Sequence, residues 1–252
     1  MKTDSKAYWI YGDHAVRAAL QNTQRHIYRL VVVDKNTGNE SPSLSKPLAK
    51  LATPMERVDK AAFQKILQTH LGPLGTQVVH QGIAALVAPL SSYALEDIVA
   101  LNPGPCRIAI LDQITDPHNI GAVLRSAAAF QLAAVVMTSH HAPQHLGVVA
   151  KTASGGLERV PLVTITNLAR GLEMLKKEGF WCAGLDGEGE TPLDQWEPAQ
   201  RTALVLGAEG KGLRPLTRAH CDLLVRIPTQ ESFGSLNVSN AAAISFYTLF
   251  SK

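Results

Sequence analysis

Short apolar runs alternate with amphipathic helical stretches from Arg107 onward, and this alternation limits the possible folds more than any other feature of the chain. Strand-like runs occupy Ile108–Asp112, Ala133–Met137, Phe180–Gly184, Ala203–Leu206 and Leu223–Ile227. Helical periodicity occurs in Ile120–Phe130, Leu168–Glu178 and Val238–Phe250. Such alternation predicts an α/β fold, with a parallel sheet covered by helices on both faces. Ligands of these sheets bind beyond the carboxyl ends of the strands, so we expect functional residues directly after strands.

A smaller α/β module is predicted before this region. Its expected elements are a helix over His14–Leu20 capped by Asp13, a strand at Leu30–Val33, a helix through Asp59–Leu67 and a strand at Ile83–Ala88. Three prolines between positions 89 and 105 surround a short helical segment and indicate a linker. We therefore predict a first domain at 1–88, a linker at 89–104 and a second domain at 105–252.

The basic residues are concentrated in the first of these domains. Residues 1–88 hold 11 Lys and Arg against 6 Asp and Glu, a balance of +5, whereas residues 89–252 hold 13 against 15, a balance of −2. This distribution suits a module that docks on a polyanion such as nucleic acid. Charge alone favours an ordinary solvated surface equally.

The cysteines and the hydropathy of the chain bear on its compartment. Cys106, Cys182 and Cys221 are far apart and odd in number, which fits neither a disulfide framework nor a zinc cluster. They are expected to pack in the core, and a reducing cytoplasm is the simplest location. No run of about 18 apolar residues occurs, so we expect no membrane span.

Three polar segments follow predicted strands. In the first, a loop after Asp112 leads to a helix that begins near Asn119, with Arg125 outside the apolar stripe of that helix. In the second, a strand runs into a Gly-rich turn from which Glu209 projects. The glycine spacing differs from that of a phosphate loop, which disfavours a nucleotide triphosphatase. In the third, Ser235-Leu-Asn237 leads into a helix of small residues. Each segment alone is explained by ordinary helix capping or turn formation.

Together the three segments resemble the signature motifs of SpoU-type RNA ribose 2′-O-methyltransferases of the SPOUT superfamily. The similar stretches are Asp116-Pro-His-Asn-Ile-Gly with Arg125, Leu206-Gly-Ala-Glu-Gly and Ser235-Leu-Asn-Val-Ser, in order and at suitable spacing. Lys151-Thr-Ala-Ser-Gly-Gly is also similar to the family. Tyr11-Gly-Asp-His-Ala-Val and His80-Gln-Gly-Ile resemble its small ribosomal-protein-like RNA-binding module, as found in the branch that methylates guanosine of bacterial 23S ribosomal RNA.

The resemblance implies a C-terminal parallel-sheet SPOUT domain with a trefoil knot, preceded by the RNA-binding domain. It implies S-adenosylmethionine as cofactor, 23S ribosomal RNA as partner and a homodimer whose second subunit helps to build the site. Gly207, Ile227 and Leu236 would hold the cofactor, largely through backbone groups. The implied reaction is methylation of a ribose 2′-oxygen in structured RNA.

The resemblance gives the central catalytic role to Arg125. A free guanidinium is a very poor base, with a pKa above about 12. We therefore expect Arg125, acting together with a neighbouring RNA phosphate, to orient and acidify the 2′-hydroxyl. Asn119, Glu209, Ser235 and Asn237 would position the arginine, the ribose and the loop backbone.

Other functions stay open from the sequence. They are a transfer-RNA ribose 2′-O-methyltransferase, a non-catalytic RNA-binding protein of the same fold, and a dinucleotide-dependent oxidoreductase. The last lacks a proper glycine fingerprint, because Gly184-Leu-Asp-Gly-Glu-Gly has the wrong spacing and is expected to be a turn. Histidines at 140, 141 and 145 could suggest a metal site, but neither carboxylate nor thiolate lies nearby in the sequence. We expect no metal and interpret this segment as a loop near the cofactor.

Overall fold

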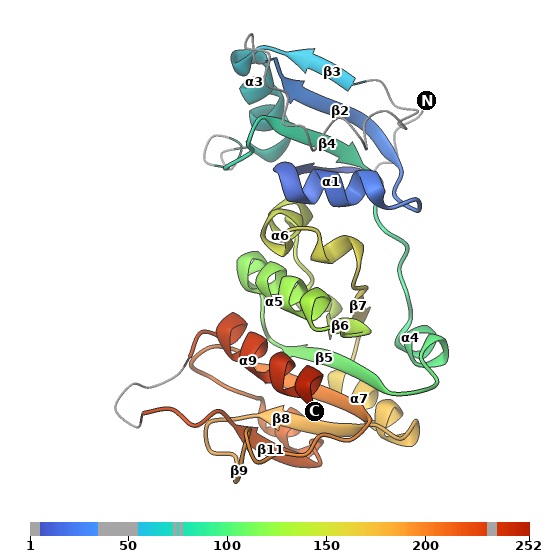
Figure 1. The fold of residues 1–252 in the computed structure, drawn as a ribbon, viewed down its shortest axis with the longest axis vertical. Coiled ribbons are helices and arrows are strands. Elements are labelled where there is room, and N and C mark those ends of the chain that lie inside the picture. The colour runs from blue at the N-terminus through green and yellow to red at the C-terminus, as the bar shows by residue number, and fades with distance from the viewer. Residues whose placement is uncertain (1–5, 35–54, 73–74, 76–77, 231–235) are drawn as a thin grey trace. The chain divides into compact units, whose positions relative to one another are not determined.

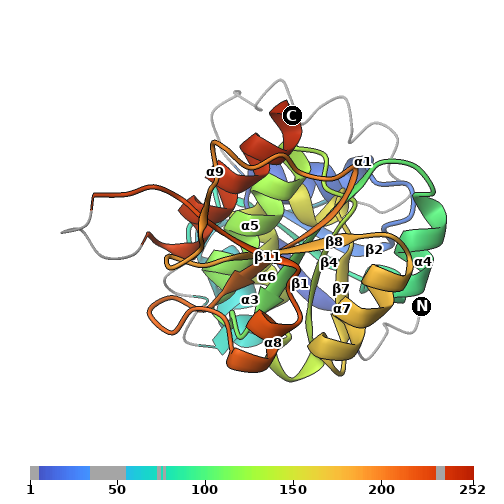
Figure 2. The same ribbon diagram turned by 90° about the horizontal axis from the view of Figure 1, so that it is seen from below.

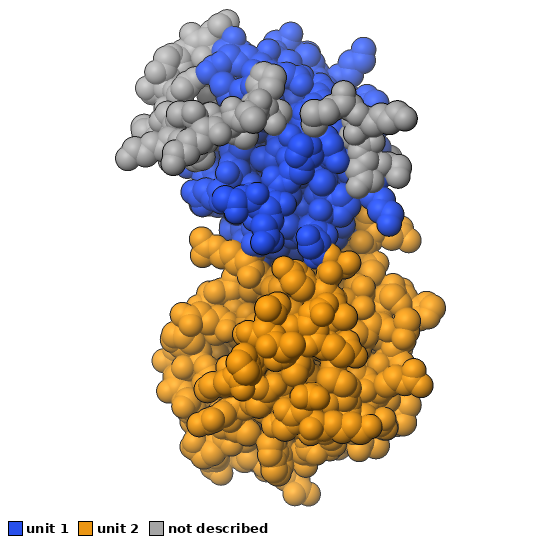
Figure 3. All heavy atoms as spheres, turned by 90° about the vertical axis from the view of Figure 1, so that its right-hand side faces the viewer, with its two compact units in different colours: residues 1–91, 145–158 blue, residues 92–144, 159–252 orange. Residues whose placement is uncertain are grey.

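The computed structural model describes residues 6–34, 55–72, 75, 78–230 and 236–252 of the chain (Figure 1). The chain forms two compact units (Figure 3). The first unit comprises residues 1–91 together with 145–158, and the second comprises 92–144 and 159–252. The two compact units thus differ from the contiguous domains predicted above, because residues 145–158 group with the N-terminal part.

The second unit contains the predicted parallel sheet. Its strands are β5 (Cys106–Asp112), β6 (Ala134–Thr138), β7 (Leu162–Ile165), β8 (Trp181–Leu185), β9 (Thr191–Pro192), β10 (Arg201–Gly207) and β11 (Leu223–Arg226). Their order is β7-β6-β5-β10-β8-β11-β9, and every neighbouring pair is parallel. All five strands expected from the sequence are present within a residue or two of the predicted ends. The short strands β7 and β9 were not predicted.

Helices cover both faces of this sheet (Figure 2). They are α4 (Leu95–Leu101), α5 (Pro117–Ala129), α7 (Leu168–Lys177), α8 (Pro215–Ala219) and α9 (Val238–Ser251). Alternate strand residues such as Ile108 and Val205 pack against α4 and α7 in one apolar cluster. Helices α5 and α9 lie side by side on the other face, where Ala242 of α9 is fully buried. The small side chains of α9 permit this close packing.

The first unit is built on a four-stranded sheet in the order β1-β4-β2-β3. The strands are β1 (Tyr8–Tyr11), β2 (Ile27–Val33), β3 (Met55–Val58) and β4 (Ile83–Val87), with helices α1 (Asp13–Gln21) and α3 (Lys60–Leu71). The side chains of Trp9, Val31 and Phe63 are among those that form its core. The predicted helices and strands are present, and β1 and β3 are additional. The role of Asp13 as a helix cap is wrong, since α1 begins at Asp13 after Gly12 and lacks a side-chain cap.

Residues 145–158 contribute helix α6 (Leu146–Ala153) and a short 3-10 turn, η3 (Gly156–Glu158), to the first unit. Helix α6 packs against β1 and α1. A Cβ atom on Gly147 would collide with the carbonyl oxygen of Trp9, and one on Gly155 would lie 2.9 Å from Ala18 Cβ. Glycine at these two positions therefore permits the close contact between the segment and the N-terminal elements.

The three cysteines lie in surroundings that keep their thiols protonated. Burial raises the pKa of Cys182 and of Cys221 to about 12 and raises the pKa of Cys106, so the three thiols are poor nucleophiles at neutral pH. The predicted packing role of Cys106 and Cys182 is confirmed by their burial, and Cys221 is half-buried. None of the described helices is long and apolar enough to cross a membrane.

Candidate active site

A pocket of about 420 Å³ opens beyond the carboxyl ends of β8, β10 and β11. Its walls come from the loops that follow these strands and from the start of α9. Because the three strands are neighbours in a parallel sheet, their C-terminal loops converge at one edge. Gly207, Ile227 and Leu236, which the sequence resemblance assigned to the cofactor, all line this pocket. The volume falls within the range of small-molecule sites.

The turn after β10 is narrow because of its glycines. A Cβ atom on Gly207 would collide with the backbone of Gly212, and Gly212 N donates to Ala208 O at 2.8 Å. Gly210 and Gly212 have φ values of 77° and 64°, a conformation that side-chain-bearing residues rarely adopt. The turn thus exposes peptide groups toward the pocket. Glu209 projects from it and also lines the pocket.

Asn237 joins the three sequence motifs. Its Nδ2 donates to Asn119 Oδ1 on α5 and to Glu209 Oε2 in the glycine turn, both at 3.2 Å. Its Oδ1 accepts from Ser239 N at 2.9 Å and from Ser239 Oγ at 2.6 Å, which caps α9. Donor and acceptor atoms of this amide are therefore all engaged. The side chain of Asn237 thus links α5, the turn after β10 and the start of α9.

Asn119 lies inside α5 and does not cap it. The helix begins two residues earlier, at Pro117, and Asp116 Oδ1 accepts from His118 N at 2.9 Å as the actual cap. Proline suits the first position of a helix, because that backbone nitrogen needs no hydrogen bond there. The amide of Asn119 is consequently available to bond Asn237. The expected helix start near Asn119 is therefore two residues late.

Arg125 stands apart from this cluster. It lies six residues beyond Asn119 on α5, about 9 Å along the helix axis, and its side chain is exposed. Its position outside the buried stripe of α5 is confirmed. Arg125 is absent from the lining of the pocket. Ser235, the remaining predicted site residue, lies outside the described residues.

A buried ion pair that sequence reasoning missed holds the far end of the glycine turn. The side chain of Asp112 is fully buried at the end of β5, where it pairs in register with Gly207 of β10. Its Oδ1 accepts from Arg214 Nε at 2.6 Å, and its Oδ2 accepts from Arg214 N at 3.0 Å. Both ends of the turn are thereby tied to the end of β5. The charged residue at the end of the predicted strand was the one feature of the sequence that could have indicated this ion pair.

The turn after β8 and helix α8 supply a second group of charged residues that was not predicted from the sequence. Asp186, Glu188 and Arg218 all line the pocket. Arg218 Nη1 lies 3.3 Å from Asp186 Oδ2 and 3.2 Å from Glu188 Oε2. The expected turn in this stretch is present, since Glu188 N donates to Asp186 Oδ1 at 2.9 Å. The pocket therefore combines carboxylates, a guanidinium and exposed peptide groups.

The histidines of the segment 140–145 lie outside the pocket lining. His141 Nδ1 lies 2.7 Å from Thr138 Oγ1, within hydrogen-bond distance. Over the part of the chain that the structure describes, no three His, Cys, Asp or Glu side chains gather as metal ligands would. The expected proximity of this segment to the cofactor stays a prediction.

Comparison with known proteins gives matches over nearly the whole chain. Residues 107–247 match the SpoU rRNA Methylase family, and residues 9–93 match the RNA 2′-O ribose methyltransferase substrate binding family. The 23S rRNA (guanosine-2′-O-)-methyltransferase RlmB of Salmonella typhimurium is 40% identical over 241 residues, which cover 94% of this chain and 96% of that protein. The protein of the same name from Xylella fastidiosa is 36% identical over 247 residues, covering 97% and 96%.

Solved structures agree on the fold. The SpoU methyltransferase AviRb from Streptomyces viridochromogenes, crystallised with the cofactor AdoMet, has a TM-score of 0.78 at 21% identity, covering 98% of this chain and 90% of that one. A structure described as an RNA 2′-O ribose methyltransferase has a TM-score of 0.76 at 23% identity, covering 96% and 87%. The family match, the parallel sheet and the three motifs joined at one pocket lead to a single assignment: the chain belongs to the SpoU rRNA methylase family.

Proposed function

We propose that this protein transfers a methyl group from S-adenosylmethionine to the 2′-oxygen of a ribose in RNA, with a guanosine of 23S ribosomal RNA as its substrate. The observation that carries the proposal is the Asn237 cluster, which joins Asn119, Glu209 and the start of α9 beside the pocket. The names of relatives at 36–40% identity support the choice of substrate.

The residues around the pocket fit S-adenosylmethionine. The glycine turn leaves its backbone groups accessible, and the carboxylates and Arg218 suit a ligand with hydroxyl, ammonium and carboxylate groups. We propose that Gly207, Ile227 and Leu236 hold the cofactor, which when bound supplies a methyl group already activated by its sulfonium. The protein then needs to place the ribose in line with that methyl and to handle one proton.

The proton step is assigned to Arg125. The 2′-hydroxyl is a weak nucleophile until it loses its proton, and we propose that Arg125 and an adjacent RNA phosphate orient and acidify it. Asn119, Glu209 and Asn237 would hold the surrounding backbone in place, and Ser235 would contribute from the loop before α9. Since Arg125 is exposed and absent from the lining of its own pocket, we propose that it serves the pocket of a partner subunit.

Helix α9 offers a surface for that partner. Ile244, Tyr247 and Phe250 of α9 are 42%, 60% and 46% exposed. Phe130, at the end of the neighbouring helix α5, stacks edge-on against Tyr247 with ring centroids 6.0 Å apart. An apolar face of this kind on a polar surface suits association. We propose that two copies of the chain pair through α5 and α9 to form a homodimer.

Replacing Tyr247 by glutamate is expected to convert the dimer into a monomer. Association would bury the unpaired carboxylate, which is costly in free energy. The fold of each subunit should persist, because Tyr247 is exposed. Sedimentation velocity of the wild type and the Y247E variant would measure the association, with circular dichroism to verify folding. Trp181→Glu, at an exposed apolar residue at the start of β8, is the matched control and should remain dimeric. Dimerisation of Y247E with wild-type affinity would contradict this interface.

Two further expectations complete the proposal. The C-terminal segment is proposed to pass through a loop and form the trefoil knot that the family resemblance implies. The cytoplasm is the proposed location, in accord with three unpaired cysteines and a ribosomal RNA substrate.

The activity is tested by methyl transfer from labelled S-adenosylmethionine to in-vitro transcribed 23S ribosomal RNA, with transfer RNA as the competing substrate. Incorporation into 23S ribosomal RNA that maps to a guanosine 2′-oxygen is the expected result. Incorporation into transfer RNA alone would favour the transfer-RNA enzyme. Two outcomes would overturn the proposal. One is a protein that binds the cofactor but methylates neither RNA, and the other is a protein that binds RNA but fails to bind the cofactor.

Replacing Glu209 by alanine is expected to lower kcat/KM by about tenfold or more. The Glu209 carboxylate accepts a hydrogen bond from Asn237 Nδ2, and loss of a hydrogen bond to a charged group costs roughly 1.5–3 kcal/mol. Steady-state methylation assays would measure the loss. Glu209→Gln keeps an acceptor oxygen and should retain more activity than E209A. Activity of E209A within about twofold of the wild type would show that the carboxylate is only solvated.

A further inference from the structure

Three sequence segments that the catalytic pocket does not use meet within the first unit. They are Tyr11–Val16, His80–Ile83 and Lys151–Gly156, and each resembles the family in sequence. The third belongs by sequence to the methylase family match, which spans residues 107–247. By structure it packs with the N-terminal elements that match the substrate-binding family. Its side chains are therefore placed to act with the RNA-docking part of the protein.

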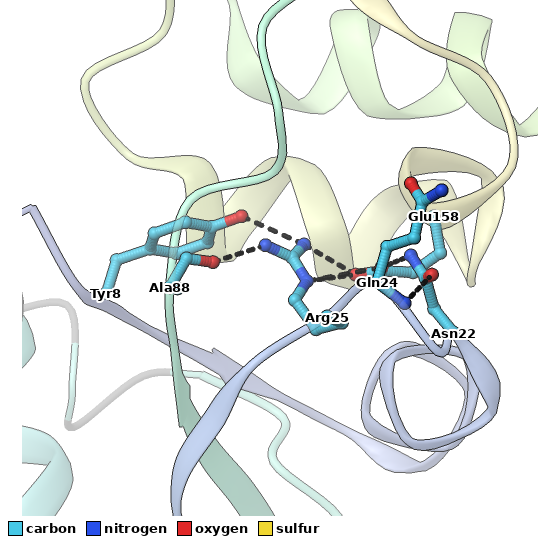
Figure 4. A network of polar contacts seen from close by, with 6 residues as sticks. All are labelled: Tyr8, Asn22, Gln24, Arg25, Ala88 and Glu158. Atoms are coloured by element: carbon cyan, nitrogen blue, oxygen red, sulfur yellow. Dashed lines mark hydrogen bonds and ion pairs between the residues drawn. The ribbon is translucent and has the colours of Figure 1, made fainter.

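A buried ion pair fixes this segment in the first unit (Figure 4). Arg25 Nη2 contacts Glu158 Oε1 at 2.5 Å, and the two side chains are 0% and 5% exposed. The guanidinium also donates to Ala88 O at 2.6 Å and to Tyr8 Oη at 3.1 Å. Asn22 Nδ2 donates to the other carboxylate oxygen of Glu158 at 2.8 Å. These bonds hold the end of the segment in one position, which sets the position of helix α6 before it.

Lys151 extends from α6 across the backbone of Gly12. A Cβ atom on Gly12 would collide with Nζ, Cδ and Cε of Lys151, so the glycine provides the space through which the lysine passes. The ammonium then donates to Gln81 Oε1 at 2.6 Å. The same oxygen accepts from Asp13 N at 3.0 Å, and Gln81 has a φ of 57°, an uncommon value for a residue with a side chain. The lysine is thus held at a defined place.

The charge of Lys151 lacks a carboxylate partner among the ion pairs that the described residues form. The negative charge of Asp13 acts on Lys151, but the Asp13 carboxylate is already paired with Arg17 Nε at 2.8 Å. Burial lowers the pKa of Lys151, which is the sign of an ammonium that is incompletely solvated. Burial and the charges of Lys60 and Lys151 also lower the pKa of His80. A half-buried cation without a counter-ion is costly unless a ligand provides one.

We propose that Lys151 binds a phosphate of the RNA backbone that docks on the first unit. The ammonium has three donors, of which Gln81 takes one, so donors remain for phosphate oxygens. The methylase part of the sequence thereby contributes a contact to the RNA-docking surface. This inference rests on the proposed RNA substrate and adds a binding residue to it.

The test measures binding of the full-length protein to in-vitro transcribed 23S ribosomal RNA across a series of salt concentrations. Lys151→Met should weaken binding about tenfold at low salt and make the slope of log affinity against log salt shallower by about one, because one phosphate contact is lost. Lys151→Arg keeps the charge and should retain the wild-type slope. Lys65→Met removes an exposed lysine from α3 of the same unit and is the matched control, expected to change the slope little.

A purely structural role would give a different pattern. Lys151→Gln removes the charge but can still donate to Gln81, so its slope separates phosphate binding from support of the fold. A shallower slope in K151Q with an unchanged melting temperature supports the proposal. A wild-type slope in both K151M and K151Q, or an equal loss of slope in K65M, overturns it. Methyl transfer by the wild type is measured separately, so failure of the proposed activity is distinguished from failure of this contact.

Discussion

Replacing Arg125 by alanine should lower the single-turnover rate of methyl transfer by about 10²–10⁴-fold, the range associated with loss of a proton-transfer group. Affinity for S-adenosylmethionine should change little, because Arg125 is absent from the pocket lining of its own chain and its proposed contacts are the ribose hydroxyl and an RNA phosphate. The fold should also persist, since substitutions of exposed side chains usually alter stability by less than about 0.5 kcal/mol. Quenched single-turnover assays and calorimetric titration with the cofactor would measure the two quantities.

A lysine at position 125 tests whether activity needs only the positive charge of Arg125 or also the shape of its guanidinium group. Arg125→Lys keeps a cation but loses the planar fork of donors that can bind hydroxyl and phosphate together, so we expect most of the activity to be lost. A rate for R125A close to that of the wild type would remove Arg125 from the mechanism. An R125A protein that no longer binds cofactor would mean that the side chain supports the pocket and has no part in the proton step.

Mixed dimers test whether the arginine acts across subunits. Each R125A subunit has an intact Glu209, and each E209A subunit has an intact Arg125. If Arg125 serves the partner's pocket, one pocket of the mixed dimer contains both residues and activity reappears on mixing. If Arg125 serves its own pocket, every pocket lacks one residue and mixing restores nothing. The outcome assigns the arginine to one subunit without altering any other side chain.

Replacing Glu158 by alanine should destabilise the protein by about 3–5 kcal/mol, the usual cost of leaving one partner of a buried ion pair alone. Arg25 would retain the hydrogen bonds to Ala88 O and Tyr8 Oη but would lose its only charge partner in the buried network of Figure 4. Denaturation by urea would measure the loss. Hydrogen exchange should show increased opening in residues 145–158 and in β1, which packs against α6.

The chain contains a matched control for this prediction. Arg29 and Glu56 form an ion pair at 2.8 Å whose side chains are 39% and 41% exposed. Exposed pairs contribute at most about 1 kcal/mol, so Glu56→Ala should be much milder. A double variant with apolar residues at both buried positions, Arg25→Met with Glu158→Leu, should recover much of the stability, because buried pairs also carry a large desolvation cost. Equal losses for E158A and E56A would contradict the burial argument.

The parallel sheet of the second unit follows from the sequence because its strands are long enough to show continuous apolar runs. The two residues of β9 are too few for such a pattern, and Thr164 interrupts the apolar run of β7. Both strands form because neighbouring strands are already in place. The convergence of the three motifs was also expected, since loops at the carboxyl ends of parallel strands share one edge. Helix starts were predicted less well. Helix α5 begins at Pro117 after its cap Asp116, where a start near Asn119 was expected, and α1 lacks the expected cap by Asp13.

The sequence by itself therefore determined the class of fold, the family and the neighbourhood of Asn119, Glu209 and Asn237, because these depend on local periodicity and on motifs of fixed spacing. Only the tertiary structure decided that Asp112 holds the glycine turn through Arg214, a contact across 102 residues. It alone decided that residues 145–158 pack with the N-terminal unit. The physical reason is common to both: packing and charge pairing between distant segments depend on three-dimensional proximity, which leaves no periodic trace along the chain.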